Sequence, residues 1–197
     1  MKAIVVEGDQ TLVWKEVPAP ALGPKEVAIA VKATAINRAD LMQRRGLYPP
    51  PPGASSVLGL ECAGIVSAVG DETVRFKVGD AVCALLPGGG YAEQVAVDEG
   101  SVVPVPDGFD FVQAAALPEV YATAWLNLFI EAELQPGERC VVLLERVGLA
   151  VPLPSFAGRL GFLVLSPSGV MRSSTTASRW VLGLGTFEQT GPSKKRS

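Results

Sequence analysis

The chain has 197 residues, 48% of them hydrophobic and 19% charged, with 21 glycines, 16 prolines and a formal net charge of −3. This composition excludes a disordered or collagen-like chain and predicts one or at most two compact domains with a hydrophobic core. No apolar run reaches the roughly 18 residues that cross a membrane, and the opening Met1–Val6 run is too short for a signal peptide, so we expect a soluble, cytoplasmic protein.

Short apolar runs alternate with glycine and proline over the first half of the chain. Turn signals separate them at Gly23-Pro24, Gly70-Asp71, Gly79-Asp80 and Pro106-Asp107-Gly108. The runs predict strands at Ala3–Val6, Leu12–Val13, Val27–Val31, Gly64–Val69, Ala81–Leu86, Tyr91–Val97 and Val102–Val105. Such a succession is typical of an all-β barrel or sandwich.

Two helical segments interrupt this pattern. Asn37–Arg45 begins with a residue type that commonly caps helices, lacks β-branched residues and ends at Gly46. The second segment covers Phe109–Ala116 and resumes after a proline as Glu119–Glu133, which contains good helix formers and an apolar stripe. We therefore expect two helices in a mainly β domain.

The composition of the chain changes near Leu144. After a turn at Gln135–Glu138, Arg139–Leu144 is predicted to be a buried strand. Residues 1–144 hold 10 Lys and Arg against 18 Asp and Glu, whereas residues 145–197 hold 7 against 2. The chain therefore joins an acidic part to a basic one.

Five segments carry a family resemblance, namely Asn37–Gly46, Tyr48–Gly53, Gly59–Gly64, Leu85–Ala92 and Ala114–Glu119. Together they resemble the medium-chain dehydrogenase/reductase superfamily and, within it, the zinc-free NADPH:quinone oxidoreductases, close to the p53-inducible type. Each motif alone is weak, but all five occur in order over residues 1 to about 144.

The resemblance implies a two-domain fold and a redox reaction. Residues 1–115 would form a mainly β, GroES-like substrate domain, a partly open barrel with two helices. Residues 116–144 would supply the linking helix and the first strand of an α/β Rossmann nucleotide-binding domain. The implied reaction is hydride transfer from NADPH to a quinone or another electrophilic carbonyl, in a homodimer. The preference for NADPH over NADH rests on the resemblance alone.

The same resemblance bears on metal binding. Zinc-dependent alcohol dehydrogenases of this superfamily carry cysteine where this chain has Asn37, and histidine where it has Leu60. Leucine has no donor atom, an amide is a poor zinc ligand, and the chain has no histidine and only three widely spaced cysteines. We therefore expect no metal site and no disulfide framework, and direct hydride delivery to an electron-poor acceptor becomes the expected chemistry.

Three site residues follow from the resemblance, each with a structural alternative. Asn37 would lie beside the nicotinamide ribose and the acceptor, and it could equally be the N-cap of its helix. The hydroxyl of Tyr48 would face the quinone pocket, or its ring would pack on neighbouring prolines. Thr123 would lie near the nicotinamide, or bond back to a helix carbonyl. Asn37 and Tyr48 are thus the catalytic candidates, and Asn37 and Thr123 the cofactor-binding candidates.

Three charged residues in the same segments are expected to be structural. Arg38 and Asp40 would form an ion pair or a cap at the start of the first helix. Glu61 would follow a strand and hold a loop, and we do not assign it the role of a general acid.

The resemblance stops after Leu144, where a glycine-rich dinucleotide turn is expected. The chain continues instead as Glu145–Pro154, with two prolines where a helix should run. Codons shifted by one base permit Gly-Ala-Ser-Gly-Ala-Gly over this stretch, so one hypothesis is that residues 145–197 are the family's own gene read in a shifted frame. The alternative is a different, disordered C-terminus. This tail is basic, but it lacks the interleaved aromatic residues of nucleic-acid modules and so matches them poorly.

The sequence therefore predicts a chain of NADPH-dependent quinone oxidoreductase descent that acts on a small molecule, not on nucleic acid or a membrane. Its activity is expected to be impaired, because the cofactor domain is missing. The alternative is a non-catalytic GroES-like module that takes part in protein interaction or regulation.

Overall fold

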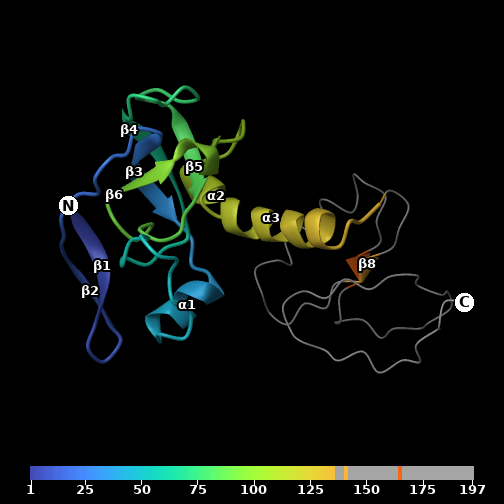
Figure 1. Ribbon diagram of the computed structural model, residues 1–197, viewed down its shortest axis with the longest axis horizontal. Helices are drawn as coiled ribbons and strands as arrows, with labels where there is room; N and C mark the ends of the chain where they lie inside the picture. Colours follow the sequence, from blue (N-terminus) through green and yellow to red (C-terminus); the bar gives the residue numbers. More distant parts are fainter. Residues whose placement is uncertain (136–139, 142–163, 166–197) are drawn as a thin grey trace, which may run out of the picture. The chain divides into compact units, whose positions relative to one another are not determined.

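The computed structural model describes residues 1–135, 140–141 and 164–165 of the chain. The chain divides into two units, Met1–Thr123 and Ala124–Ser197. Every strand predicted for the first unit is present, as β1 (Lys2–Glu7), β2 (Thr11–Glu16), β3 (Glu26–Thr34), β4 (Glu61–Val69), β5 (Ala81–Leu85), β6 (Gln94–Asp98) and β7 (Val102–Pro104) (Figure 1).

Five of these strands form one antiparallel sheet in the order β6-β3-β4-β5-β7. Its two edge strands, β6 and β7, do not pair with each other, so the sheet is open within the described part of the chain. β1 and β2 form a separate hairpin, which an isolated bridge between Ala3 and Ala92 joins to the segment before β6. The predicted mainly β, partly open architecture is confirmed.

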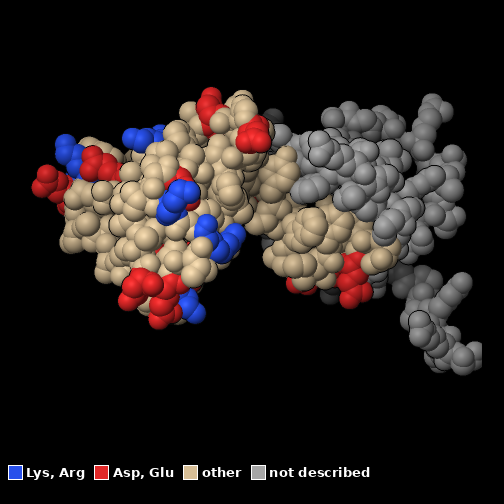
Figure 2. Space-filling model, turned by 90° about the horizontal axis from the view of Figure 1, so that it is seen from above, with Lys and Arg blue, Asp and Glu red and all other residues tan. Residues whose placement is uncertain are grey.

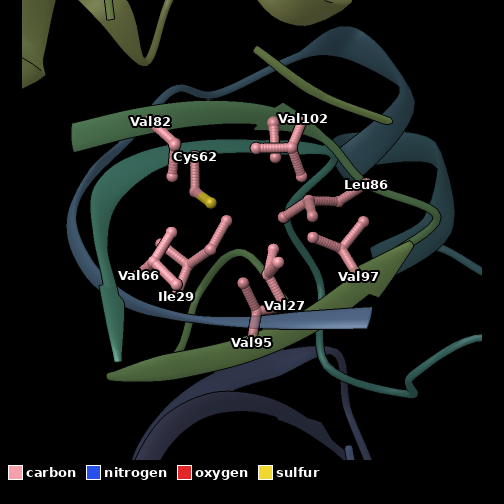
Figure 3. Packing of buried hydrophobic residues seen from close by; sticks show 10 residues of the cluster. Val27, Ile29, Cys62, Val66, Val82, Leu86, Val95, Val97 and Val102 are labelled. Atoms are coloured by element: carbon pink, nitrogen blue, oxygen red, sulfur yellow. The ribbon is translucent and has the colours of Figure 1, made fainter. Parts of the chain in front are cut away.

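The main core lies against one face of this sheet, where the ribbon curves around the buried side chains (Figure 3). Alternation of β-branched residues builds it, since every second residue of a strand points to the same face. Its members are Val27, Ile29, Cys62, Val66, Val82, Ala84, Leu86, Val95, Val97 and Val102. A smaller cluster of Ala63, Cys83, Ala114 and Ala115 packs helix α2 (Phe111–Ala114) against β4 and β5.

The first predicted helix is confirmed as α1 (Arg38–Arg44), with Asn37 at its N-cap. The second segment is more broken than expected. It consists of α2, capped by Asp110, then α3 (Pro118–Trp125) and a π-helical stretch η2 (Leu126–Glu131). The widened turn ends where the N–H of Ala132 donates to the carbonyl of Asn127, 3.1 Å away. A single-turn 3₁₀ helix, η1 (Glu99–Ser101), precedes β7.

Little of the second unit is described beyond η2. Two short strands, β8 (Cys140–Val141) and β9 (Val164–Leu165), pair in parallel. β8 falls inside the strand predicted for Arg139–Leu144, and parallel pairing is the kind that α/β domains use. The expected glycine-rich turn and the rest of the 145–197 tail lie outside the described residues. No described helix is both long and apolar enough to span a membrane.

Candidate functional site

Asn37 stands at the start of α1 and is held there by its own backbone. Its N–H donates to Asp40 Oδ2 over 2.7 Å, and its carbonyl accepts from the N–H of Asp40 over 3.1 Å. The side chain is engaged elsewhere, because Nδ2 donates to Glu61 Oε1 over 2.8 Å. Asn37 is therefore the N-cap residue that the sequence predicts, and its amide is also fixed by a carboxylate from the sheet.

Glu61 joins two helix starts from a buried position. It is the first residue of β4 and only 1% of its surface is exposed. While Oε1 accepts from Asn37, Oε2 accepts from the backbone N–H of Glu119, 2.9 Å away in the first turn of α3. A helix N-terminus favours an anion at this place. The expectation that Glu61 follows a strand and holds a loop is wrong in position, since it begins a strand and holds two helices.

The carboxylates around Asn37 perturb one another. Burial raises the pKa of Glu61, and the hydrogen bonds from Asn37 and Glu119 oppose this rise. Burial also raises the pKa of Glu119, and the nearby charge of Glu61 adds to the increase. The hydroxyl of Thr123 lies 3.5 Å from Glu119 Oε1 and favours its ionised form.

Asp40 is a second buried acceptor, with 2% of its surface exposed. Besides the Asn37 N–H, Oδ2 accepts from the hydroxyl of Tyr91 over 2.9 Å, while Oδ1 accepts from the N–H of Gly59 over 3.2 Å. Gly59 has φ +106°, and a Cβ there would lie 2.6 Å from the Tyr91 nitrogen, so this turn requires glycine. Asp40 is thus the predicted cap. No ion pair with Arg38 occurs within the described residues.

The structure brings two of the three predicted site residues into one network. Asn37 connects through Glu61 and the backbone of Glu119 to the hydroxyl of Thr123. Tyr48 lies outside it, on the loop after α1, and is 49% exposed. Sequence reasoning missed the part played by Glu119 and undervalued Glu61. The available signal for Glu61 was a glutamate directly before the apolar run that starts at Cys62, because a charge that is buried there must be paired.

The donor set around Asn37 does not suit zinc. Leu60 is apolar and 8% exposed, and the Asn37 amide nitrogen already donates to a carboxylate. In the described part of the chain, no group of three or more His, Cys, Asp or Glu side chains is arranged to hold a metal ion. Leucine and an engaged amide are not zinc ligands by their side-chain chemistry, and zinc independence of the chain stays a prediction.

Comparison with known proteins agrees with this geometry. Residues 23–107 match the alcohol dehydrogenase GroES-like domain. A quinone oxidoreductase of Pseudomonas aeruginosa is 39% identical over 155 residues, which cover 78% of this chain and 47% of that protein. The chain spans less than half the length of the curated relatives it matches.

Solved structures give the same result. The human synaptic vesicle membrane protein VAT-1 homolog-like protein superposes with a TM-score of 0.75 and 32% identity, over 84% of this chain and 55% of that one. An NAD-dependent alcohol dehydrogenase superposes with a TM-score of 0.72 and 29% identity, over 84% and 57% of the two chains. Residues 23–107 therefore match a GroES-like domain, and the chain is similar to oxidoreductases and VAT-1 homologues of the medium-chain dehydrogenase/reductase superfamily.

Proposed function

We propose that the chain derives from a zinc-independent NADPH:quinone oxidoreductase and carries the substrate half of its site. The observation that supports this most is the Asn37 amide, held by the buried Glu61 carboxylate at the position where zinc enzymes of the superfamily have cysteine. With apolar Leu60 beside Glu61, the acceptor would have to be electron-poor already, as a quinone is.

The residues of this chain would then bind and orient the two reactants. Asn37 and Thr123 would hold the nicotinamide end of the cofactor, since both are half-buried polar groups on one hydrogen-bonded network. When bound, the nicotinamide supplies the hydride. Tyr48 would donate a hydrogen bond to the acceptor oxygen as negative charge develops there. Exposed apolar residues on either side of α1, Ile36 and Leu47, would contact a flat apolar acceptor.

The proposal extends to the organisation of the chain. Residues 1–115 would be the substrate domain, residues 116–144 the link and first strand of the nucleotide domain, and residues 145–197 a tail outside the family. Such a chain would bind NADPH weakly and turn over slowly. Intact mass from the native source, with DNA sequencing across the codons for Leu143–Arg146, tests the frameshift. A mass near 20.6 kDa, with the DNA sequence confirmed, shows that the chain is a real product and rejects the idea that the shifted frame is a sequencing error.

Activity is tested on the purified chain and on a chimera. In the chimera, residues 1–123 replace the matching part of the Pseudomonas aeruginosa quinone oxidoreductase. We expect the chimera to oxidise NADPH with 1,4-benzoquinone in the presence of a zinc chelator, at least 10-fold faster than the chain alone. The Asn37→Ala chimera should lose most of this rate. A folded chimera without quinone-dependent oxidation, or one that the chelator inhibits, contradicts the proposal.

A second candidate function is that of a non-catalytic interaction module, which we also expect in the cytoplasm. The apolar side chains of Leu12 and Trp14 are 43% and 52% exposed on the β1–β2 hairpin, a surface that suits a protein partner. On the face shown in Figure 2, acidic and basic side chains are interspersed over the described residues, which gives no reason to propose nucleic acid. Light scattering of the chain mixed with the two-domain relative, together with an NADPH-binding measurement on the chain, distinguishes the candidates. An interaction module should form a mixed complex and should not bind NADPH.

A further inference from the structure

Both oxygens of the Glu61 side chain are acceptors, and their donors come from different elements. Oε1 accepts from the side-chain amide of Asn37 at the start of α1, and Oε2 from the backbone N–H of Glu119 at the start of α3. The hydroxyl of Thr34 additionally donates to the Glu61 carbonyl over 2.7 Å, which fixes the backbone of this residue. One side chain from the sheet thus sets the position of two helix ends.

Only an ionised carboxylate meets both demands. A glutamine would offer one acceptor oxygen and turn an NH₂ group toward the second donor, and a protonated acid would place a hydroxyl hydrogen on one side. We infer that Glu61 is a positioning residue of the proposed site, whose carboxylate fixes the Asn37 amide and the first turn of α3 in one arrangement. That these groups belong to a substrate site rests on the proposed function, whereas the hydrogen bonds of Glu61 do not depend on it.

The surroundings of Glu61 oppose its ionisation. Burial and the charge of Asp40 on α1 raise its pKa, and Glu119 on α3 is a further carboxyl coupled to it. The thiols of Cys62 and Cys83 on β4 and β5 also face it, and its charge raises their pKa values. No described salt bridge gives it a cationic partner. Its charge is balanced by two N–H donors, so protonation of Glu61 should release the Asn37 amide while the fold still holds.

The chain allows this amide to be observed directly, because it contains only two asparagines, Asn37 and Asn127. Selective ¹⁵N-asparagine labelling of the full chain gives two side-chain NH₂ pairs, and Asn127→Gln leaves only that of Asn37. We expect the Asn37 pair to shift with pH, with a midpoint above the ordinary glutamate value of about 4.3. Glu61→Gln should remove this titration and move the signal.

Glu119→Gln is the matched control, since it keeps the Glu61 carboxylate and the backbone donor while removing a neighbouring charge. Its Asn37 pair should still titrate, with a lower midpoint than in the wild type. An Asn37 signal that is the same in Glu61→Gln as in the wild type overturns the inference. If Glu61→Gln does not fold, the wild-type titration decides, and a signal that stays flat between pH 4 and 8 overturns it.

Addition of NADPH to the labelled wild-type chain and to the chimera separates this inference from the proposed function. If NADPH leaves the Asn37 pair unshifted in both proteins while the Glu61-dependent titration is present, the proposed function fails and the positioning role stands. If NADPH shifts the pair and Glu61→Gln changes nothing, the positioning role fails and the function stands.

Discussion

Replacement of Asp40 by asparagine tests whether this buried carboxylate holds α1 against the rest of the first unit. Asp40 accepts three hydrogen bonds, from the N–H of Asn37 at 2.7 Å, the hydroxyl of Tyr91 at 2.9 Å and the N–H of Gly59 at 3.2 Å. In the variant, the single amide oxygen can serve the first two donors only if the NH₂ group faces the third. The N–H of Gly59 then loses its partner in a buried place.

The magnitude follows from these three contacts. An unpaired buried N–H costs about 1–3 kcal/mol, and each surviving bond weakens by about 1 kcal/mol when its acceptor becomes neutral. Relief from burying a charge offsets part of this sum. We therefore expect Asp40→Asn to lower the free energy of unfolding by about 2–4 kcal/mol, and Tyr91→Phe by about 1–2 kcal/mol. Because the two side chains are bonded, the double variant should show a coupling of about 1 kcal/mol.

Urea unfolding at pH 7, followed by far-ultraviolet circular dichroism, measures these differences. Asp71→Asn is the control, since Asp71 is exposed in the turn after β4 and should change stability by less than about 0.5 kcal/mol. If Asp40→Asn behaves like this control, or if Asp40→Asn and Tyr91→Phe are simply additive, the network around α1 does not stabilise the fold in the way argued.

Three further predictions follow from the same unit. Burial raises the pKa of Glu119, so the stability that depends on its protonation is fully present below about pH 4.3 and is lost as the pH rises through the folded-state pKa. Glu119→Gln should therefore match the wild type at pH 4 and be more stable than the wild type at pH 7 in urea unfolding. A Cβ at Gly64 would lie 2.1 Å from the Ala30 carbonyl oxygen, so Gly64→Ala should lower the free energy of unfolding in urea by about 2–3 kcal/mol. Gly8→Ala is the control, because a Cβ there has no atom within 4 Å, and it should lower that free energy by less than about 0.5 kcal/mol. Burial raises the pKa of Cys62 to about 12 and of Cys83 to about 11, so in a Cys140→Ser background Ellman's reagent should modify neither thiol until urea unfolds the chain. Fast reaction of the folded protein would contradict the burial of these thiols.

The strands could be predicted because their signal is local. Runs such as Val27–Val31 and Tyr91–Val97 combine β-branched residues with glycine and proline at their ends, and each falls on a strand or overlaps one. The order β6-β3-β4-β5-β7 could not be obtained this way, because pairing depends on contacts between residues far apart in the chain. The π-helical turn of η2 also gave no signal, since its mainly apolar residues continue the helical pattern of α3 without a break.

The candidate site was predictable only where one residue carries the information. Asn37 entered the candidate site through the family resemblance. Its alternative role as an N-cap was predicted because residues of its type begin helices, and the structure places it at that cap. The link from Asn37 to Glu61 joins residues 24 positions apart, and that from Glu61 to Glu119 joins residues 58 positions apart. Neither link has a sequence pattern, because a side-chain hydrogen bond across the fold needs no periodicity. The role of Tyr48 stays a prediction from the resemblance.

The charge of the site leads to a last prediction, on the choice of acceptor. Asp40 and Glu61 are buried carboxylates beside Asn37, Glu119 lies half-buried next to them, and the described salt bridges give none of the three a cationic partner. An anionic acceptor would meet their combined repulsion, and a neutral quinone would not. In the chimera, 1,4-naphthoquinone should therefore have a kcat/KM at least about 5-fold higher than naphthoquinone-2-sulfonate in low salt. The ratio should fall as added salt shortens the range of the repulsion from about 30 Å at 0.01 M to about 10 Å at 0.1 M. Equal kcat/KM values for the two quinones, or a ratio that does not respond to salt, would mean that these carboxylates do not act on the acceptor.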